Sequence, residues 1–512
     1  MGYREISLKL PADYNEDELR KGIGKELGIQ EFSYQIENKS LDARKKENIH
    51  WLVRVLVLSG EVEGGVPLLS PSLEIPYRKR RERAVVVGSG PAGFFAAFIL
   101  QKAGFHTTII ERGTDVHKRA EGIREFEKTG VFNPVSNYAF GEGGAGTFSD
   151  GKLTSRSKHI SKERQFILAS YISAGAPEEI GYMAHPHLGS DNLRKIVRNL
   201  RDAFSNIGGS VLFETMLEDL KIKDGKVIEA ITTSGGIEAD YFIIAPGHSA
   251  YETYRMLIRR GVQFRTKNFA IGSRVEHPQE IINKAQWGRE RLPGVKAAEY
   301  RLTSPGDGNL PVYTFCMCPG GTVVPAAAYQ DTNIVNGMSL YMRDGKFANA
   351  ACVAGVHPDK LIGREATPEE ALDWLGALEQ SFYQYSDGFK APFCSIQNFI
   401  NRKEPAEIVE SSYPLELKPA ALWNLLPAEV SSSIREGLKD FSRKIKGFET
   451  GSIMGLESKT SSPIQVLREK DSRCTGFENL YLVGEGSGCA GGIISSGADG
   501  IKAAINIIEN NV

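Results

Sequence analysis

The sequence AVVVGSGPAG, residues 84–93, determines the fold class of this chain. Four apolar residues predict a buried strand, and the spacing of Gly88, Gly90 and Gly93 matches the G-x-G-x-x-G pattern between a strand and a helix. Gly88 permits a tight turn, Gly90 lets the backbone approach a pyrophosphate, and Gly93 lets the helix pack closely on the sheet. The pattern therefore predicts a dinucleotide site contacted by residues of this turn: Gly88, Ser89, Gly90, Pro91, Ala92 and Gly93.

The segment that follows completes a strand–helix–strand unit. A helix is predicted over residues 91–102, where Pro91 suits the first turn because that position needs no N–H donor. A second apolar run at 107–110 implies a parallel sheet. It ends at Glu111, about 20 residues after the first glycine, where a carboxylate can accept hydrogen bonds from ribose hydroxyls and repels a 2′-phosphate. The alternative is a glycine-rich turn in an unrelated α/β domain.

The C-terminal part of the chain favours FAD over NAD as the bound dinucleotide. Residues 479–493, NLYLVGEGSGCAGGI, predict a strand, then Gly484 and Glu485, then glycines and a helix. This arrangement resembles the FAD-binding superfamily related to glutathione reductase and p-hydroxybenzoate hydroxylase, in which the chain returns to its first domain through a strand ending in Gly–Asp. The resemblance implies that Glu485, where Asp is usual, faces the ribityl chain, and that the backbone at the flavin pyrimidine comes from Gly491, Gly492 and Ile493.

Intermediate segments share this resemblance. It implies cofactor contacts from Arg112 and Arg119, from Met216 beside the adenine, and from Ala245 and Gly247 in the strand FIIAPG. Along the pyrophosphate it implies contacts from the glycine-rich loop, whose backbone N–H groups suit an anion, at Gly143, Gly144, Gly146 and Thr147.

The chain also resembles a narrower family, the bacterial FAD-dependent, or NAD(FAD)-utilising, dehydrogenases. The motifs that carry this resemblance are FGEGGAGTFSDGKLTSR (140–156), FAIGSRVEHPQ (269–279), TFCMCPGGTVVPA (314–326) and ESKTSSP (457–463). The resemblance extends over essentially the whole chain, including SLDARK at 40–45. It implies FAD and an oxidoreductase in the cytosol, and it leaves the substrate open.

We therefore expect an α/β protein built around a Rossmann-like FAD-binding domain. The expected parts are a small N-terminal α+β domain (1–77), the first part of the FAD-binding domain (78–264), an inserted α+β substrate domain (265–450) and the C-terminal return (451–512). In the first part, strands are expected at 3–10, 29–36 and 49–58, and Asn15 with Glu18 predicts a capping box.

Composition narrows the class of protein. Lys and Arg number 62 against 63 Asp and Glu in 512 residues, which disfavours capture of nucleic acid or of an anionic membrane through overall charge. Six cysteines do not make a disulfide framework, and neither a signal peptide nor an apolar span is evident, so we expect a cytoplasmic protein. No metal site is predicted, because no cysteine or histidine spacing is typical of one.

Only a few residues are candidates for a role in catalysis or substrate binding. Lys152 follows the glycine-rich loop and could place a positive charge near the flavin or an anionic substrate. Arg274 and His277 are the candidates for the substrate side, because their strand belongs to the inserted domain. Cys316 and Cys318 would face one side of a strand, since the side-chain period is two. They are either a thiol pair near the flavin edge or two small buried residues.

The leading functional hypothesis is an FAD-dependent oxidoreductase that transfers a hydride between flavin and a small-molecule substrate, with NADH or NADPH as a transient partner. No second complete G-x-G-x-x-G with a trailing acid suggests a separate NAD domain. The alternatives are a flavin-dependent enzyme that modifies tRNA, which the balanced charge disfavours, and a flavin-bound sensor without turnover. The sequence does not predict the oligomeric state.

Overall fold

The computed structural model describes residues 2–65, 72–405 and 409–510. Residues 66–71 of the predicted N-terminal domain, 406–408 of the predicted inserted domain, and the terminal residues 1 and 511–512 lie outside the described residues.

The N-terminal unit is a three-stranded antiparallel sheet in the order β1-β3-β2, with one helix on a face. The strands are β1 (Gly2–Pro11), β2 (Ser33–Asp42) and β3 (His50–Ser59), and the helix is α1 (Glu16–Leu27). The predicted capping box is confirmed: the Asn15 side chain accepts from the Glu18 N–H at 3.0 Å and the Glu18 carboxylate accepts from the Asn15 N–H at 2.9 Å. The second strand begins four residues later than predicted, after the turn that ends α1.

The second part is a five-stranded parallel sheet in the order β22-β10-β4-β5-β6. Its strands are β4 (Arg83–Val87), β5 (His106–Ile110), β6 (Ser210–Leu212), β10 (Tyr241–Ile244) and β22 (Leu480–Leu482). Strand β22 pairs with β10, so the predicted return of the chain end to the first sheet is confirmed. Residues 84–87 are buried on both faces, as expected of a continuous apolar strand in a parallel sheet.

Helices cover one face of this sheet, and a small sheet with one helix covers the other. The helices on the first face are α2 (Pro91–Lys102), α4 (Ser161–Ser173), α5 (Gly189–Asn206) and α13 (Ile493–Glu509). On the second face lie β7 (Leu217–Lys223), β8 (Lys226–Thr232), β9 (Gly235–Glu238) and α6 (Tyr251–Arg259). Helix α3 (Val116–Thr129) follows β5. The core is thus the layered arrangement of a Rossmann-like domain, as predicted.

A seven-stranded mixed sheet forms the third part, in the order β13-β14-β17-β12-β20-β18-β19. Its strands are β12 (Phe269–Pro278), β13 (Thr303–Ser304), β14 (Val312–Cys318), β17 (Phe347–Val356), β18 (Ala391–Ser395), β19 (Leu417–Pro419) and β20 (Ser452–Glu457). Because β20 pairs with β12 and β18, the sheet continues past residue 450, where we expected the inserted domain to end. Strands β11 (Phe264–Thr266) and β21 (Ile464–Val466) pair at the two crossings between the parts.

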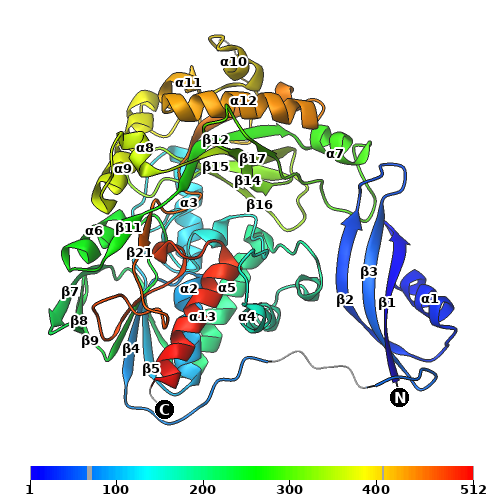
Figure 1. Cartoon of the computed structure of the whole chain (residues 1–512), viewed down its shortest axis with the longest axis horizontal. Helices are drawn as coiled ribbons and strands as arrows, with labels where there is room; N and C mark the ends of the chain where they lie inside the picture. The colour runs from blue at the N-terminus through cyan, green and yellow to red at the C-terminus, as the bar shows by residue number, and fades with distance from the viewer. Residues whose placement is uncertain (1, 66–71, 406–408, 511–512) are drawn as a thin grey trace.

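Helices lie on the outer face of this sheet (Figure 1), and the hairpin β15 (Gly321–Pro325) and β16 (Val335–Ser339) covers its inner face. The helices of this part are α7 (Gln279–Trp287), α8 (Pro358–Ile362), α9 (Pro368–Ser386), α10 (Ile396–Asn401), α11 (Leu422–Leu425) and α12 (Ala428–Lys444). Short 3-10 turns are η1 (Ala145–Phe148), η2 (Glu178–Gly181), η3 (Phe448–Thr450) and η4 (Gly484–Ser487). Val324 of the hairpin packs on α3, which joins this part to the parallel sheet.

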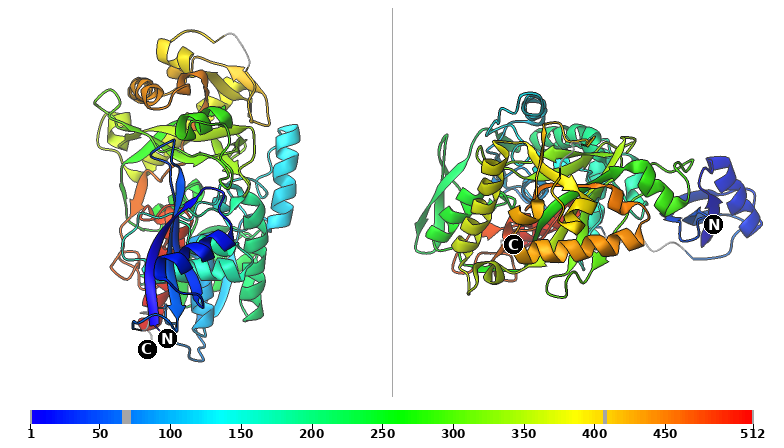
Figure 2. Two further views of the ribbon diagram at one scale, coloured as in Figure 1. Left: turned by 90° about the vertical axis from the view of Figure 1, so that its right-hand side faces the viewer. Right: turned by 90° about the horizontal axis from the view of Figure 1, so that it is seen from above.

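The N-terminal unit stands to one side of the other two parts (Figure 2). It meets them at the edge of β2, where the Lys39 N–H donates to the Tyr182 carbonyl and the Lys39 carbonyl accepts from the Ala184 N–H, both at 2.9 Å.

Candidate functional site

The turn between β4 and α2 has glycine where backbone packs on backbone. A Cβ added to Gly93 would lie 1.9 Å from the Gly88 carbonyl oxygen, and one added to Gly88, at φ +96°, would lie 2.3 Å from the Ala245 oxygen. Gly90 differs, because the nearest atom to its added Cβ is Gly144 Cα at 3.7 Å. Gly90 is the N-cap of α2, and no side chain caps the helix there. The first-turn N–H groups are thus available to a phosphate.

Glu111 holds this turn together. Its buried carboxylate accepts from Ser89 N (3.0 Å), Ser89 Oγ (2.8 Å), Gly113 N (2.9 Å) and Gly141 N (3.1 Å). These four donors match the acceptor capacity of a carboxylate. A ribose hydroxyl would therefore have to replace one of them, and the rotatable Ser89 hydroxyl is the one that can turn away. The ribose contact of Glu111 stays a prediction.

Arg119 does not reach the space where we expected the cofactor. Its side chain is fully buried beneath the glycine-rich loop, and its guanidinium donates to five carbonyl oxygens at 2.8–3.2 Å, those of Asn137, Tyr138, Gly141, Glu142 and Gly144. All its donors point into the loop, so the predicted direct contact is replaced by a positioning role. Burial lowers the pKa of Arg119 to about 10, which leaves it charged at neutral pH.

The first turn of α13 forms the other end of the site. Gly491 and the N-cap Gly492 are exposed, and no side chain caps this helix. Helix α13 packs so closely on α2 that a Cβ on Gly500 would lie 2.0 Å from the Ala92 oxygen. Glu485 lies beside Gly491, with its Oε1 3.6 Å from the added Cβ. The first turn of α2 therefore packs against the middle of α13, and both helices begin without a side-chain cap.

The glycine-rich loop spans these two ends. A Cβ on Gly144 would lie 3.0 Å from Gly90 Cα, and one on Gly146 would lie 3.3 Å from Ile493 Cγ1. Thr147 turns inward instead, where its buried hydroxyl donates to the Glu142 carbonyl at 3.3 Å. The loop thus follows the line expected of a pyrophosphate, with backbone rather than side chains toward it.

The remaining predicted cofactor residues lie around this line. Arg112 stacks on Phe140 at 3.8 Å and pairs with Glu252 at 2.5 Å. Gly247, at φ +68°, follows Ala245 beside the Gly88 turn. Both backbone polar groups of Met216 are bonded to Thr233, so only its side chain is available to an adenine.

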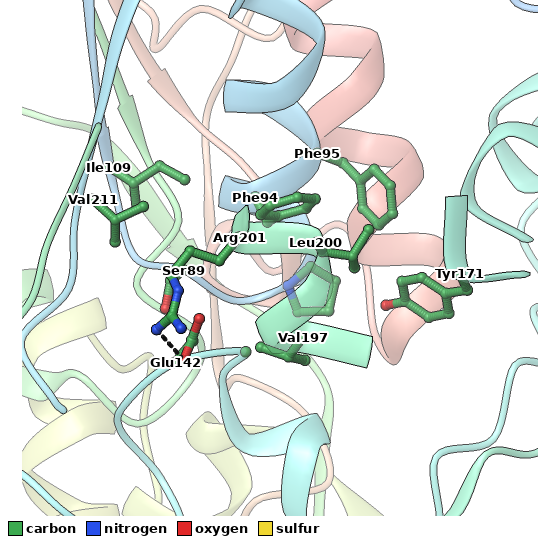
Figure 3. A pocket seen from close by; sticks show the side chains of 12 residues that line it. Ser89, Phe94, Phe95, Ile109, Glu142, Tyr171, Val197, Leu200, Arg201 and Val211 are labelled. Carbon is green, nitrogen blue, oxygen red and sulfur yellow. Dashed lines mark hydrogen bonds and ion pairs between the residues drawn. The ribbon is translucent and has the colours of Figure 1, made fainter. Parts of the chain in front are cut away.

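A narrow apolar pocket opens beside the first turn of α2 (Figure 3). Glu142 and Arg201 form an ion pair of 3.1 Å at its polar end. Glu142 Oε1 is buried and has no hydrogen-bond partner among the described residues, and burial raises the pKa of this carboxyl group. An unpaired buried oxygen next to the turn fits a site that is completed by a polar ligand. Glu142 belongs to the motif FGEGGAG, but the sequence alone does not indicate a role for it.

Lys152 and Arg274, predicted from distant segments, meet at one strand. Lys152 Nζ donates to the Met317 carbonyl and lies 3.7 Å from the Glu299 carboxylate. Arg274 Nη2 donates to the Cys316 carbonyl at 2.6 Å, while Nη1 pairs with Glu457 at 2.7 Å. The structure thus brings both cations to the segment 316–318. Asp150 and Arg343, which sequence reasoning missed, form a buried ion pair nearby.

His277 is not at this site. It lies three residues after Arg274 on β12, so the two side chains project from opposite faces of the strand. The ring is fully buried, packs on Phe448 and is hydrogen-bonded to the Phe448 carbonyl at 2.7 Å, and burial lowers its pKa to about 4. A buried neutral ring under the helical layer does not touch substrate, so the catalytic assignment of His277 is wrong for this structure.

Two negative findings apply to the described residues. Among residues 2–65, 72–405 and 409–510, no group of three or more His, Cys, Asp or Glu side chains could hold a metal ion. None of the helices in the same ranges combines the length and apolar character needed to cross a membrane.

Comparison with known proteins places the chain among flavin-dependent proteins. Residues 81–248 match the family described as "FAD binding domain", residues 268–460 match "FAD-dependent protein, C-terminal domain-like", and residues 3–58 match a domain of unknown function. The N-terminal match agrees with a distinct first unit.

Similar solved structures include glycine oxidase from Bacillus cereus ATCC 14579, at 12% identity and a TM-score of 0.33, covering 85% of this chain and 96% of that chain. L-proline dehydrogenase from P. horikoshii is 11% identical with a TM-score of 0.34, covering 85% and 96% respectively.

A protein of Clostridium beijerinckii (strain ATCC 51743 / NCIMB 8052), described as uncharacterized, is 38% identical to this chain. The alignment is 532 positions long and covers 99% of each chain. The cofactor is FAD, as the matched FAD-binding domain shows. The chain therefore belongs to the same family as this C. beijerinckii protein and is an FAD-dependent protein.

Proposed function

We propose that this FAD-dependent protein is an oxidoreductase that transfers a hydride between its flavin and a small-molecule substrate, with NADH or NADPH as the other partner. The observation that carries the proposal is the pair of uncapped helix N-termini, α2 and α13, joined by the backbone of the glycine-rich loop. One terminus suits a pyrophosphate, and the other suits the negative charge that develops on a reduced flavin. We also propose that the chain is a member of the NAD(FAD)-utilising dehydrogenases.

The residues present fit FAD. Gly90 and Gly492 leave open space at the two helix starts, and the unpaired Glu142 oxygen lies beside the first of them. FAD supplies the hydride-accepting and hydride-donating chemistry when it is bound. Arg119 orders the loop that would cover the pyrophosphate, because its five hydrogen bonds orient the loop carbonyls inward.

The substrate side is proposed to lie at Lys152. This ammonium group is half-buried, and its loop neighbour Ser155 is hydrogen-bonded to Ser495 in the first turn of α13 at 2.7 Å. An ammonium has three donors, so Lys152 can orient an anionic or polar substrate group besides the Met317 carbonyl. Glu299 lies 3.7 Å from both the Lys152 ammonium and the Arg343 guanidinium, so a substrate carboxylate would bind Lys152 by taking the place of Glu299.

The test is an anaerobic visible spectrum of the FAD-loaded protein before and after NADH and then NADPH. Bleaching of the flavin within seconds to minutes is expected with at least one of them. A flavin that stays oxidised with both would remove the nicotinamide partner, and a protein that neither retains FAD nor is stabilised by it would refute the whole proposal.

A second measurement examines Lys152. Small carboxylic acids should perturb the oxidised flavin spectrum more strongly than their amides, and Lys152→Met should remove that difference. Lys158→Met, a change at an exposed lysine of the same loop, is the matched control and should preserve it. Equal perturbation by acids and amides in the wild type would contradict the role assigned to Lys152.

A further inference from the structure

The segment Cys316-Met317-Cys318 departs from the regular strand that its sequence predicts. Phe315 pairs with Ala351 and Cys318 with Asn349, so β14 has one residue more than β17 between these pairs. This is a β-bulge, a device that redirects side chains and is frequent beside active sites. Cys316 has φ +46°, which is uncommon for a residue with a side chain.

Arg274 holds the bulge in place. Its Nη2 donates to the Cys316 carbonyl at 2.6 Å and lies 3.5 Å from Cys318 Sγ. The guanidinium is itself oriented by Glu457 at 2.7 Å and Asn349 Oδ1 at 2.7 Å. A fully buried arginine is thus aimed at the two-cysteine segment, and Lys152 bonds the carbonyl between the cysteines.

The two cysteines differ in access to solvent. Cys318 is buried, and its thiol donates to the Cys316 carbonyl at 3.3 Å, while Cys316 is half-buried. The contact between the Cys318 thiol and the Cys316 carbonyl shows that the bulge folds the two residues toward each other. Burial raises the pKa of both thiols, that of Cys318 to about 12, and the nearby Arg274 opposes this. At neutral pH both thiols, when reduced, are therefore protonated.

The pair also lies beside the predicted flavin end of the site. The loop that carries Lys152 touches the first turn of α13 on both sides of this lysine, through Gly146 against Ile493 and through Ser155 bonded to Ser495. The same lysine reaches Met317. One side chain therefore connects the cysteine segment to the loop that lies along α13.

We propose that Cys316 and Cys318 form a redox-active dithiol that exchanges two electrons with the flavin; this rests on the proposed function. In the oxidising direction two S–H bonds break and one S–S bond forms. Two electrons and two protons pass to oxidised FAD, which becomes FADH2. In the reverse direction the disulfide accepts two electrons and two protons and returns to two thiols. Arg274 is a positioning residue for this pair.

The test is an anaerobic reductive titration of the fully oxidised, FAD-loaded full-length protein with dithionite. The wild type should take up about four electrons per flavin, and Cys316→Ser and Cys318→Ser should each take up about two. Cys474→Ser is the matched control, since Cys474 is also buried but lies in another core cluster, and it should keep four. The FAD content of each variant shows whether it has folded.

A second readout uses only the wild type. After oxidation, unfolding in an alkylating reagent and digestion, the peptide containing residues 316–318 should be about 2 Da lighter and unalkylated. Uptake of two electrons by the wild type, with all six cysteines alkylated, would overturn the inference even if NADH or NADPH bleaches the flavin. Uptake of four electrons without bleaching by either nicotinamide would support the dithiol while refuting the nicotinamide partner.

Discussion

Replacing Arg119 tests whether one buried side chain organises the cofactor loop. Arg119→Met keeps much of the side-chain volume but removes five hydrogen bonds to carbonyls of residues 137–144. A buried carbonyl left without a partner costs about 1–3 kcal/mol, so five would cost at least 5 kcal/mol if the loop stayed in place. The loop can instead open to water, which limits the loss to about 3–5 kcal/mol, as measured when buried charged networks are broken.

This loss should appear in FAD binding. A loss of 3 kcal/mol corresponds to a weakening of about 100-fold in Kd, because each 1.4 kcal/mol is a factor of ten. Quenching of FAD fluorescence gives the affinity, and thermal unfolding with and without FAD gives the stability of both forms. Arg119→Lys should be intermediate, since an ammonium has three donors for five acceptors.

The matched control is Arg124→Met, at an exposed position of the same helix, α3, which should change neither quantity. An Arg119→Met protein that binds FAD like the wild type and unfolds within a degree of it would refute the reasoning. That result would mean that the loop is held by its own glycine-rich backbone.

Three further predictions concern the turn, the buried histidine and a buried ion pair. Gly90→Ala should leave the unfolding temperature of the apo-protein unchanged but weaken FAD binding at least tenfold, because its Cβ would occupy open space that a phosphate needs. Gly93→Ala should destabilise both the apo-protein and the FAD-bound protein, because its Cβ would lie 1.9 Å from a carbonyl oxygen. Burial lowers the pKa of His277 to about 4, so between pH 6.5 and pH 4 the unfolded chain binds a proton at this residue that the folded chain does not. The contribution of the neutral ring to the free energy of unfolding is therefore complete above pH 6.5 and is lost toward pH 4 at about 1.4 kcal/mol per pH unit. His277→Gln should make the free energy of unfolding in urea less dependent on pH over that window. Lys459→Met should cost about 3–5 kcal/mol, because it leaves Glu379 buried without the partner that lies 2.8 Å away, and Glu379→Leu in the same chain should recover much of that loss.

Each of these predictions has its own contrary outcome. Equal FAD affinity in the wild type and Gly90→Ala would move the phosphate away from α2. A pH dependence unchanged by His277→Gln would show that other groups, such as His187 with its pKa lowered to about 4 by burial, account for it. If exposed Lys446→Met destabilised the protein as much as Lys459→Met, burial of the ion pair would not be the cause.

Local patterns predicted the elements of the cofactor site well. The helix over 91–102, the capping box at Asn15 and the return strand at 480–482 follow from turn chemistry, capping and apolar runs, which act over a few residues. Glu111 could be singled out because it ends a strand whose length is set by the same rules. The cytoplasmic location and the individual cofactor contacts stay predictions.

The sequence by itself determined the strand–turn–helix that suits a dinucleotide, because this unit depends on backbone geometry that glycine and apolar spacing dictate. The return of the chain end was implied by the resemblance of residues 479–493 to a known superfamily. Only the tertiary structure decided which side chains face the site. Arg119 turns under the loop because five carbonyls there need donors, and His277 faces the helical layer because it lies an odd number of residues from Arg274. The bulge at Cys316 depends on Arg274, Asn349 and Glu457, which come from three different strands. Such contacts arise only when distant segments pack together, so no local pattern could have shown them.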